Sequence, residues 1–169
     1  MNLKYIFDGL SSSAVQTANP QRSLYERIGG RDGLARLLHH FYADVRQHAV
    51  IGPVFNRQIH DWPAHLEKIG SFWARLTGGP SDYSGQMPMK HLNLGLEAQH
   101  FGAWLQLWTF NCRGHLPSAE AGEMIGLAHE IGRRLKTILG VAPAPEYFST
   151  AGAGLLKKNF HVHEKAGPT

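Results

Sequence analysis

The stretch Met89-Lys90-His91-Leu92-Asn93-Leu94 places one histidine in a short apolar segment between two strongly amphipathic helical patterns. The pattern before it carries a second histidine, His65, on its apolar face. A single histidine near a helix is more often exposed or hydrogen-bonded than a metal ligand. Two imidazoles that face the same apolar interior make a metal site more plausible. One of them can ligate a metal while the other lies near the open coordination position of that metal.

Helical periodicity runs through almost the whole central part of the chain, and no window alternates as a half-buried strand does. Ser23 and Asp61 are expected to be N-caps, and Gly52-Pro53 predicts a tight corner rather than a long element. Residues 81–88 are expected to form a loop before the short segment around His91. The long helices are expected over residues 31–47, 62–77, 97–111 and 118–139. The predicted class is therefore all-α.

The length of 169 residues fits one domain with tails. We expect a flexible leader over residues 1–22, a folded domain over 23–140 and a tail over 141–169 with at most a short helix near 155–160. The formal charge of +4 is spread along the chain without a dense Lys/Arg run, so nucleic acid is not an expected partner. No apolar run is long enough to insert in a membrane. The single cysteine, Cys112, is expected to be buried, and one cysteine fits a reducing cytoplasm.

Two segments carry a resemblance to group III truncated haemoglobins. The loop Tyr83-Ser84-Gly85-Gln86-Met87-Pro88 before Lys90-His91-Leu92 is similar to theirs, with one extra residue before the proline. Residues 62–73, Trp-Pro-Ala-His-Leu-Glu-Lys-Ile-Gly-Ser-Phe-Trp, closely resemble their distal helix. The resemblance covers about residues 30–140, whereas residues 24–30 look like the opening of groups I and II. It implies a globin-like two-over-two helical sandwich around haem b.

The resemblance also implies roles for individual residues. His91 would be the iron ligand, while Tyr42, His65 and Trp104 would surround a ligand on the opposite side. From the residues alone, Tyr42 could equally be a core tyrosine bonded to a backbone carbonyl, since a phenol in an apolar stripe needs some partner. Trp108 is expected to be structural. The residues expected to contact haem are Phe41, Phe55, Lys68, Ile69, Phe72, Trp73, Tyr83, Met89, Lys90, His91, Leu94 and Trp104.

The function that follows is reversible binding of O₂, CO and NO, with slow O₂ release and a role in oxygen transport or ligand chemistry. Peroxidase or NO dioxygenase activity of the same haem is an alternative that needs a separate reductase. Two other classes stay open: a non-haem metal protein using several histidines, and a helical sensor or partner-binding module. A monomer or weak dimer is expected.

Overall fold

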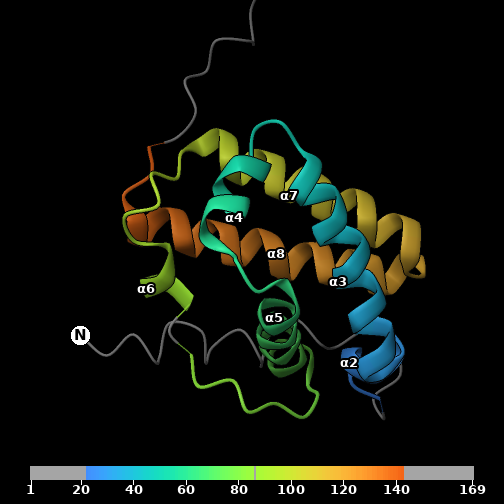
Figure 1. Ribbon diagram of the computed structural model, residues 1–169. Coiled ribbons are helices and arrows are strands. Elements are labelled where there is room, and N and C mark those ends of the chain that lie inside the picture. Colours follow the sequence, from blue (N-terminus) through green and yellow to red (C-terminus); the bar gives the residue numbers. More distant parts are fainter. Residues whose placement is uncertain (1–21, 86, 143–169) are drawn as a thin grey trace, which may run out of the picture.

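The computed structural model describes residues 22–85 and 87–142, and within these ranges every regular element is a helix (Figure 1). This confirms the all-α prediction. The elements are α2 (Leu24–Arg27), α3 (Gly30–Gln47), α4 (Gly52–Gln58), α5 (Trp62–Thr77), α6 (Met87–His91), α7 (Ala98–His115) and α8 (Ser118–Leu139). Almost all of the predicted leader and tail lies outside the described residues. Among the described helices, none has the length and apolarity needed to cross a bilayer.

Both predicted N-caps are present. The Ser23 hydroxyl accepts a hydrogen bond from the Glu26 N–H at 3.2 Å, and the Glu26 carboxylate accepts one from the Ser23 N–H at 2.9 Å. This reciprocal pair is a capping box, which satisfies two backbone donors at the start of α2. Asp61 accepts from the Ala64 N–H at 3.0 Å and fixes where α5 begins.

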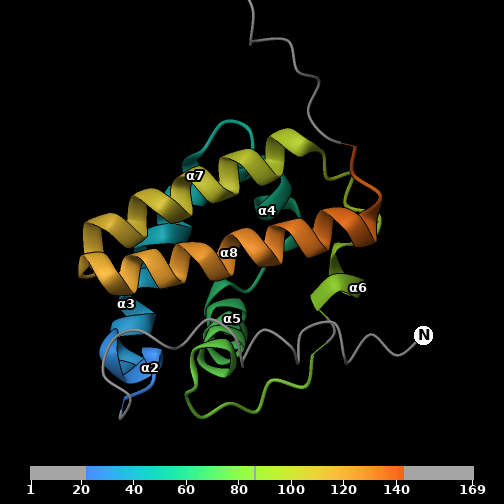
Figure 2. The ribbon, with the colours of Figure 1, turned by 180° about the vertical axis from the view of Figure 1, so that it is seen from behind.

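The helices form two layers of two. In one layer α3 packs against α5, and in the other α7 lies beside α8 along most of its length (Figure 2). The layers meet where α3 also packs on α7. The largest fully buried side chains are Trp108 and Phe41, which bring these two helices together at a ring distance of 4.9 Å. This is the two-over-two arrangement that the resemblance implied.

Two polar links tie distant segments together. Arg27 donates to Glu120 at 2.9 Å and to Glu123 at 2.7 Å, which joins the first described helix to the last one. Asn111 of α7 donates to the Asp44 carboxylate of α3 at 2.8 Å. Buried and hydrogen-bonded groups of this kind are costly to break, because removing one partner leaves the other unsatisfied.

Two elements differ from the sequence prediction. The corner at Gly52-Pro53 is in fact the first turn of the seven-residue helix α4, since proline is tolerated there. Helix α7 continues to His115, four residues beyond the predicted end at 111, because neither a proline nor a left-handed glycine interrupts it before Leu116.

Candidate functional site

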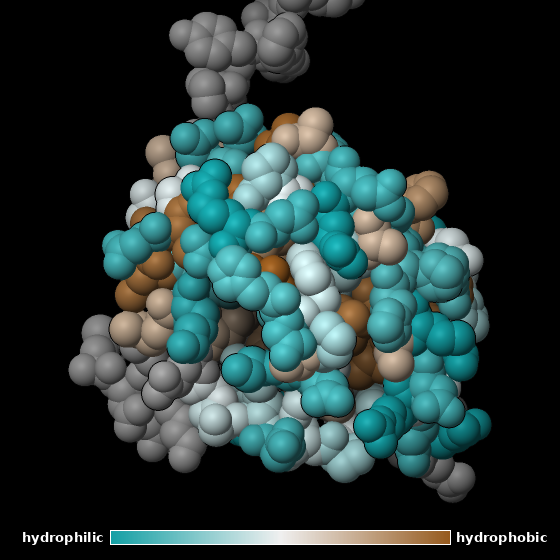
Figure 3. Space-filling model, viewed as in Figure 1, coloured by the Kyte–Doolittle hydropathy of each residue, from teal (hydrophilic) through white to brown (hydrophobic). Residues whose placement is uncertain are grey.

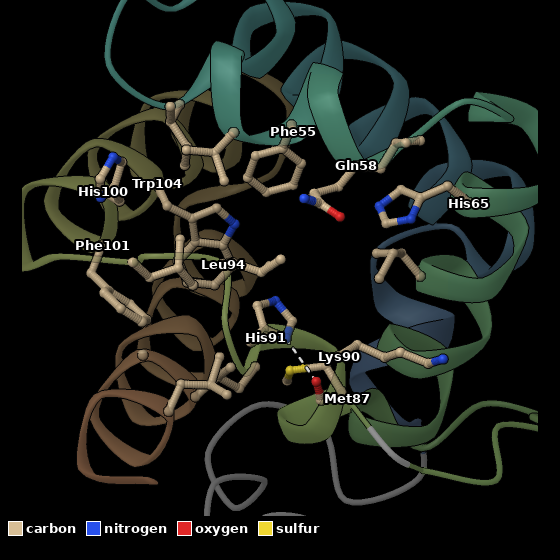
Figure 4. Close-up of a pocket in the computed structure, with 18 of the residues that line it drawn as sticks. Phe55, Gln58, His65, Met87, Lys90, His91, Leu94, His100, Phe101 and Trp104 are labelled. Atoms are coloured by element: carbon tan, nitrogen blue, oxygen red, sulfur yellow. Dashed lines mark hydrogen bonds between the residues drawn. The ribbon is translucent and has the colours of Figure 1, made fainter. Parts of the chain in front are cut away.

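A cavity of about 300 Å³ with mainly apolar walls lies between the two layers and the short helices α4 and α6. Figure 4 shows that His91 approaches its centre from α6, with Phe55, Gln58, His65 and Trp104 around the other sides. On the face shown in Figure 3, hydrophobic residues are visible in recesses between hydrophilic ones. The side chains of the protein therefore do not fill its interior completely.

His91 is the last residue of α6, and its ring points into the cavity (Figure 4). Its Nδ1 lies 2.7 Å from the carbonyl oxygen of Met87, one turn earlier. A carbonyl oxygen only accepts, so Nδ1 is the protonated nitrogen and Nε2 has the free lone pair. Burial lowers the pKa of His91, and the bond to Met87 partly opposes this. A neutral imidazole with one nitrogen fixed and the other free is the form that ligates a metal.

His65, in the first turn of α5, lies across the cavity from His91 (Figure 4). Its Nε2 is buried and has no hydrogen-bond partner within the described part of the chain. Burial lowers the pKa of His65, and electrostatic interactions with Lys68 and His91 act in the same direction. An unsatisfied buried polar atom costs about 1–3 kcal/mol. Such an atom is expected to have a polar partner that the protein itself does not supply.

Tyr42 comes from α3 and is almost fully buried. Its ring stands perpendicular to that of His65, with 5.5 Å between the ring centroids. No hydrogen bond joins its hydroxyl to any residue of 22–85 or 87–142, so the alternative of a core tyrosine bonded to a backbone carbonyl has no support there. Burial raises the pKa of Tyr42 well above its usual range. The phenol thus stays protonated and can donate a hydrogen bond into the cavity.

Trp104 lines the cavity from α7 and continues into a stack of indole rings. Its ring is 6.2 Å from that of Trp108, which in turn lies 4.4 Å from Trp73, with interplanar angles of 12° and 10°. Trp108 is 1% exposed and donates its Nε1–H to the Met124 carbonyl at 3.1 Å, so it is structural, as predicted. Trp104 and Trp73 both line the cavity, whereas Trp108 does not.

Most of the predicted site residues line this cavity. They are Tyr42, Phe55, His65, Ile69, Phe72, Trp73, Lys90, His91, Leu94 and Trp104.

Four predicted site residues lie elsewhere. Phe41 is 1% exposed and packs in the core against Trp108, because it precedes Tyr42 by one residue and so faces another side of α3. Met89 is 47% exposed and does not line the cavity. Lys68 and Tyr83 line a separate surface pocket of about 440 Å³, which shares Lys90 with the cavity.

Several lining residues were not predicted. Met87 takes the place of Met89, since in a five-residue helix the two methionines face different ways. Gln58 brings an amide to the cavity from the end of α4, an element that the sequence predicted only as a corner. Ile131 and Leu135 contribute from α8. Their spacing of four was visible as an apolar stripe, but periodicity does not say which part of a stripe meets the cavity.

Within residues 22–85 and 87–142, no three His, Cys, Asp or Glu side chains are grouped closely enough to hold a metal ion. A metal bound by protein side chains alone therefore has no support in this region. A single exposed lone pair at His91 fits a metal whose remaining ligands come with a cofactor.

Comparison with known proteins agrees with a site for a metal-containing cofactor. Residues 23–112 match the family model described as bacterial-like globin. Over 83 residues the chain is 39% identical to the group 3 truncated haemoglobin of Campylobacter jejuni, a match that covers 46% of this chain and 65% of that protein. It is 31% identical over 135 residues to the group 1 truncated haemoglobin GlbN of Mycolicibacterium paratuberculosis, covering 78% and 88% of the two chains.

A solved structure agrees with the sequence comparisons. The crystal structure of the group III truncated haemoglobin of Campylobacter jejuni superposes with a TM-score of 0.62 at 29% identity. The superposition covers 73% of this chain and 93% of that one. The alignment to the curated Campylobacter sequence is shorter and spans just under two thirds of that relative's length.

Proposed function

This chain belongs to the bacterial-like globins and is a truncated haemoglobin most similar to group III, and from that premise we propose that it binds O₂, CO and NO reversibly at a haem iron held by His91. The cofactor of this family is haem b. The observation that carries the proposal is the pair of opposed imidazoles, with one free nitrogen at His91 and an unpartnered buried nitrogen at His65.

The residues present fit haem b. The walls of the cavity are mainly apolar, which suits a porphyrin, and Leu94, Ile69 and Phe72 are among them. Lys90 lies on the rim of the cavity with an exposed side chain, so its ammonium group can pair with a haem carboxylate. The lone pair of His91 Nε2 would hold the iron, and no second protein ligand is required.

When bound in the ferrous state, haem supplies an iron that takes up diatomic gases. His91 would hold this iron from the α6 side, and its bond to the Met87 carbonyl fixes both the tautomer and the ring orientation. The mainly apolar walls limit access of water to the site. These features favour a neutral proximal imidazole and reversible binding.

Three groups on the other side can act on a bound gas. The phenol of Tyr42 stays protonated and donates, and the indole N–H of Trp104 is a second donor. Neutral His65 can donate or accept, depending on its tautomer. A hydrogen bond contributes about 1 kcal/mol net, and 1.4 kcal/mol is a tenfold change in rate. Two donors would therefore slow O₂ release by roughly one to two powers of ten.

The absorption spectrum of the purified protein tests the proposal. The oxidised protein should show a Soret band, and reduction under CO should produce the spectrum of a histidine-ligated CO complex. His91→Ala should lose this spectrum. His100→Ala is the matched control, since His100 also lines the cavity but uses its Nδ1 to accept from the Glu97 N–H. A colourless protein after haem addition, or an unchanged spectrum in His91→Ala, would overturn the proposal.

Reduction of peroxide or dioxygenation of NO by the same haem is a second candidate. The neutral imidazole of His65 favours it, because an unpartnered nitrogen beside a bound ligand can accept and return a proton. Either reaction needs electrons, and a separate reductase stays a prediction. If the oxygenated protein keeps its spectrum when NO is added, dioxygenation is excluded.

A further inference from the structure

Trp62, the first residue of α5, contacts two residues of the cavity without lining the cavity itself. Its half-buried indole meets the ring of Tyr42 at 5.9 Å and the ring of His65 at 5.8 Å. The guanidinium of Arg46 lies over the same indole, 4.8 Å from the ring centroid. Arg46 is exposed and does not line the cavity either. An exposed cation is thus linked through one indole to two residues of the cavity.

The spacing along two helices brings together a cluster of four side chains: Tyr42, Arg46, Trp62 and His65. Tyr42 and Arg46 are four residues apart on α3. Trp62 and His65 are three residues apart on α5. Residues at these spacings share a face of their helix, and the two faces meet because α3 packs against α5. The Asp61 cap fixes where α5 begins, so the indole has a defined place between the two pairs.

Ring contacts, rather than a hydrogen bond at Nε2, orient the imidazole of His65. This nitrogen has no hydrogen-bond partner among residues 22–85 and 87–142. Within the same ranges, the aromatic rings that contact His65 are Tyr42, at an interplanar angle of 90°, and Trp62, at 82°. Edge-to-face contacts of this kind are an arrangement that aromatic pairs prefer. Tyr42 is almost fully buried, so Trp62 is the contact that a surface group can strengthen.

The charge of Arg46 strengthens the position of the indole. A guanidinium within about 6 Å of an indole centroid is attracted to the negative face of the ring. In the described part of the chain, no carboxylate forms a salt bridge with Arg46. The backbone carbonyl of Arg46 accepts a hydrogen bond from the Asn56 amide at 3.0 Å. Substitution of the Arg46 side chain therefore removes its contact with Trp62 and leaves this backbone bond in place.

We propose that Trp62, held by Arg46, is a positioning residue that keeps the imidazole of His65 turned into the cavity. Without the indole, the imidazole could enter the space that the indole occupies, and His65 would populate a second orientation. The inference rests on the proposed haem function, because the orientation of His65 decides whether it meets a gas bound opposite His91. It assigns a role to Trp62 and Arg46 that ligation by His91 does not need.

The test records infrared spectra of the CO complex and nuclear magnetic resonance of the His65 imidazole in the same protein. Bound CO that meets a hydrogen-bond donor absorbs at a lower frequency, so the band areas give the populations of the two orientations. His65→Leu identifies the band that depends on the imidazole. Trp62→Leu should raise the population of the second orientation by about tenfold, the upper end of what one ring pair contributes. Arg46→Gln should raise it by about two- to fivefold, the factor for an exposed cation over an indole.

Two further variants separate positioning from a general loss of structure. Arg46→Lys should give the wild-type bands, since a lysine ammonium can also lie over the indole. Arg57→Gln is the matched control, because Arg57 is exposed on α4 and makes no ring contact within the described residues. Unchanged bands and His65 resonances in Arg46→Gln would overturn the inference, and so would an equal change in Arg57→Gln. If Trp62→Leu does not fold, Arg46→Gln decides alone, because its side chain is exposed.

The same variants distinguish failure of this inference from failure of the proposed function. A protein that takes up no haem contradicts the proposed function, and the His65 resonances of the haem-free chain then decide the inference. Resonances that split or broaden in Arg46→Gln but not in Arg57→Gln would support it. Identical His65 resonances in the wild type and both variants would overturn it.

Discussion

On the α6 side of the cavity, His91 has its Nδ1 bonded to the carbonyl oxygen of Met87, whereas on the α5 side His65 keeps a buried Nε2 that no described residue satisfies. The first ring is oriented by its own helix. The second is oriented by packing against Tyr42 and Trp62, with ring distances of 5.5 and 5.8 Å. The ring of His91 is thus held by a bond within the chain, whereas His65 keeps hydrogen-bonding capacity for a ligand that the chain does not contain.

The largest difference between the two sides is expected when His91, the ring held by a bond to its own helix, is removed. His91→Gly should weaken haem binding by more than about a hundredfold, because even losses in the outer shell of a metal site cost 10–100-fold. Free imidazole should restore the spectrum, since it can occupy the space of the missing ring. Haem transfer to a scavenger globin measures the affinity. Failure of imidazole to restore binding would show that His91 acts through packing rather than ligation.

The second prediction concerns the donors on the open side. Tyr42→Phe and Trp104→Phe should each speed O₂ dissociation by about tenfold, because each removes one hydrogen bond in a dry site. Stopped-flow displacement of O₂ by CO measures the rate. Tyr83→Phe is the control, since its ring lies outside the cavity. Unchanged O₂ dissociation in Tyr42→Phe would contradict the proposed slow release.

The third prediction uses pH to compare the two sides. Burial lowers the pKa of His65, so the unfolded chain binds protons more tightly there than the folded one. The stabilising effect of neutral His65 is complete above its ordinary pKa of 6.5 and is lost as the pH falls through that value toward the lowered folded pKa. Urea unfolding of the haem-loaded CO complex over a pH series should show this fall.

His65→Gln should make the same pH dependence shallower. His60→Gln should leave it unchanged, because the side chain of His60 is exposed. An equally steep fall in His65→Gln would assign the pH effect to another group.

The smallest effect on haem binding is expected at the rim of the cavity, where Lys90 lies. Lys90→Ala should raise the rate of haem loss by no more than about fivefold, because an exposed ion pair contributes 1 kcal/mol at most. Lys68→Ala should do less, since Lys68 lines the neighbouring pocket instead of the cavity. Haem-transfer rates at low and high salt measure both. A larger effect for Lys68 would move the haem carboxylates toward that pocket.

The sequence predicted the helices well because their caps and stripes are local. Ser23 and Asp61 cap α2 and α5 as expected, and the long apolar stripes gave α3, α5 and α8 nearly to the residue. The short helix α4 has only seven residues, too few to show a period. A helix as short as α4 can be identified only from the folded structure.

Residues of the site were harder to predict than helices for a geometric reason. Successive residues on a helix are rotated by about 100°, so Phe41 and Tyr42 face the core and the cavity respectively although both belong to one stripe. The same rotation separates Met87 from Met89. Gln58 lies in the short helix and had no pattern to identify it. Family resemblance drew attention to this part of the chain, but which side chains line the cavity is visible only in the folded structure.

The ion pairs of Arg27 have a consequence for how the protein is made. Their acceptors, Glu120 and Glu123, stand on the last described helix, and the same helix gives the cavity Ile131 and Leu135. A chain still emerging from the ribosome lacks these ion pairs and this wall of the cavity until α8 has been synthesised. The cavity can therefore close only after translation has passed Leu135, because its α8 wall is missing until then.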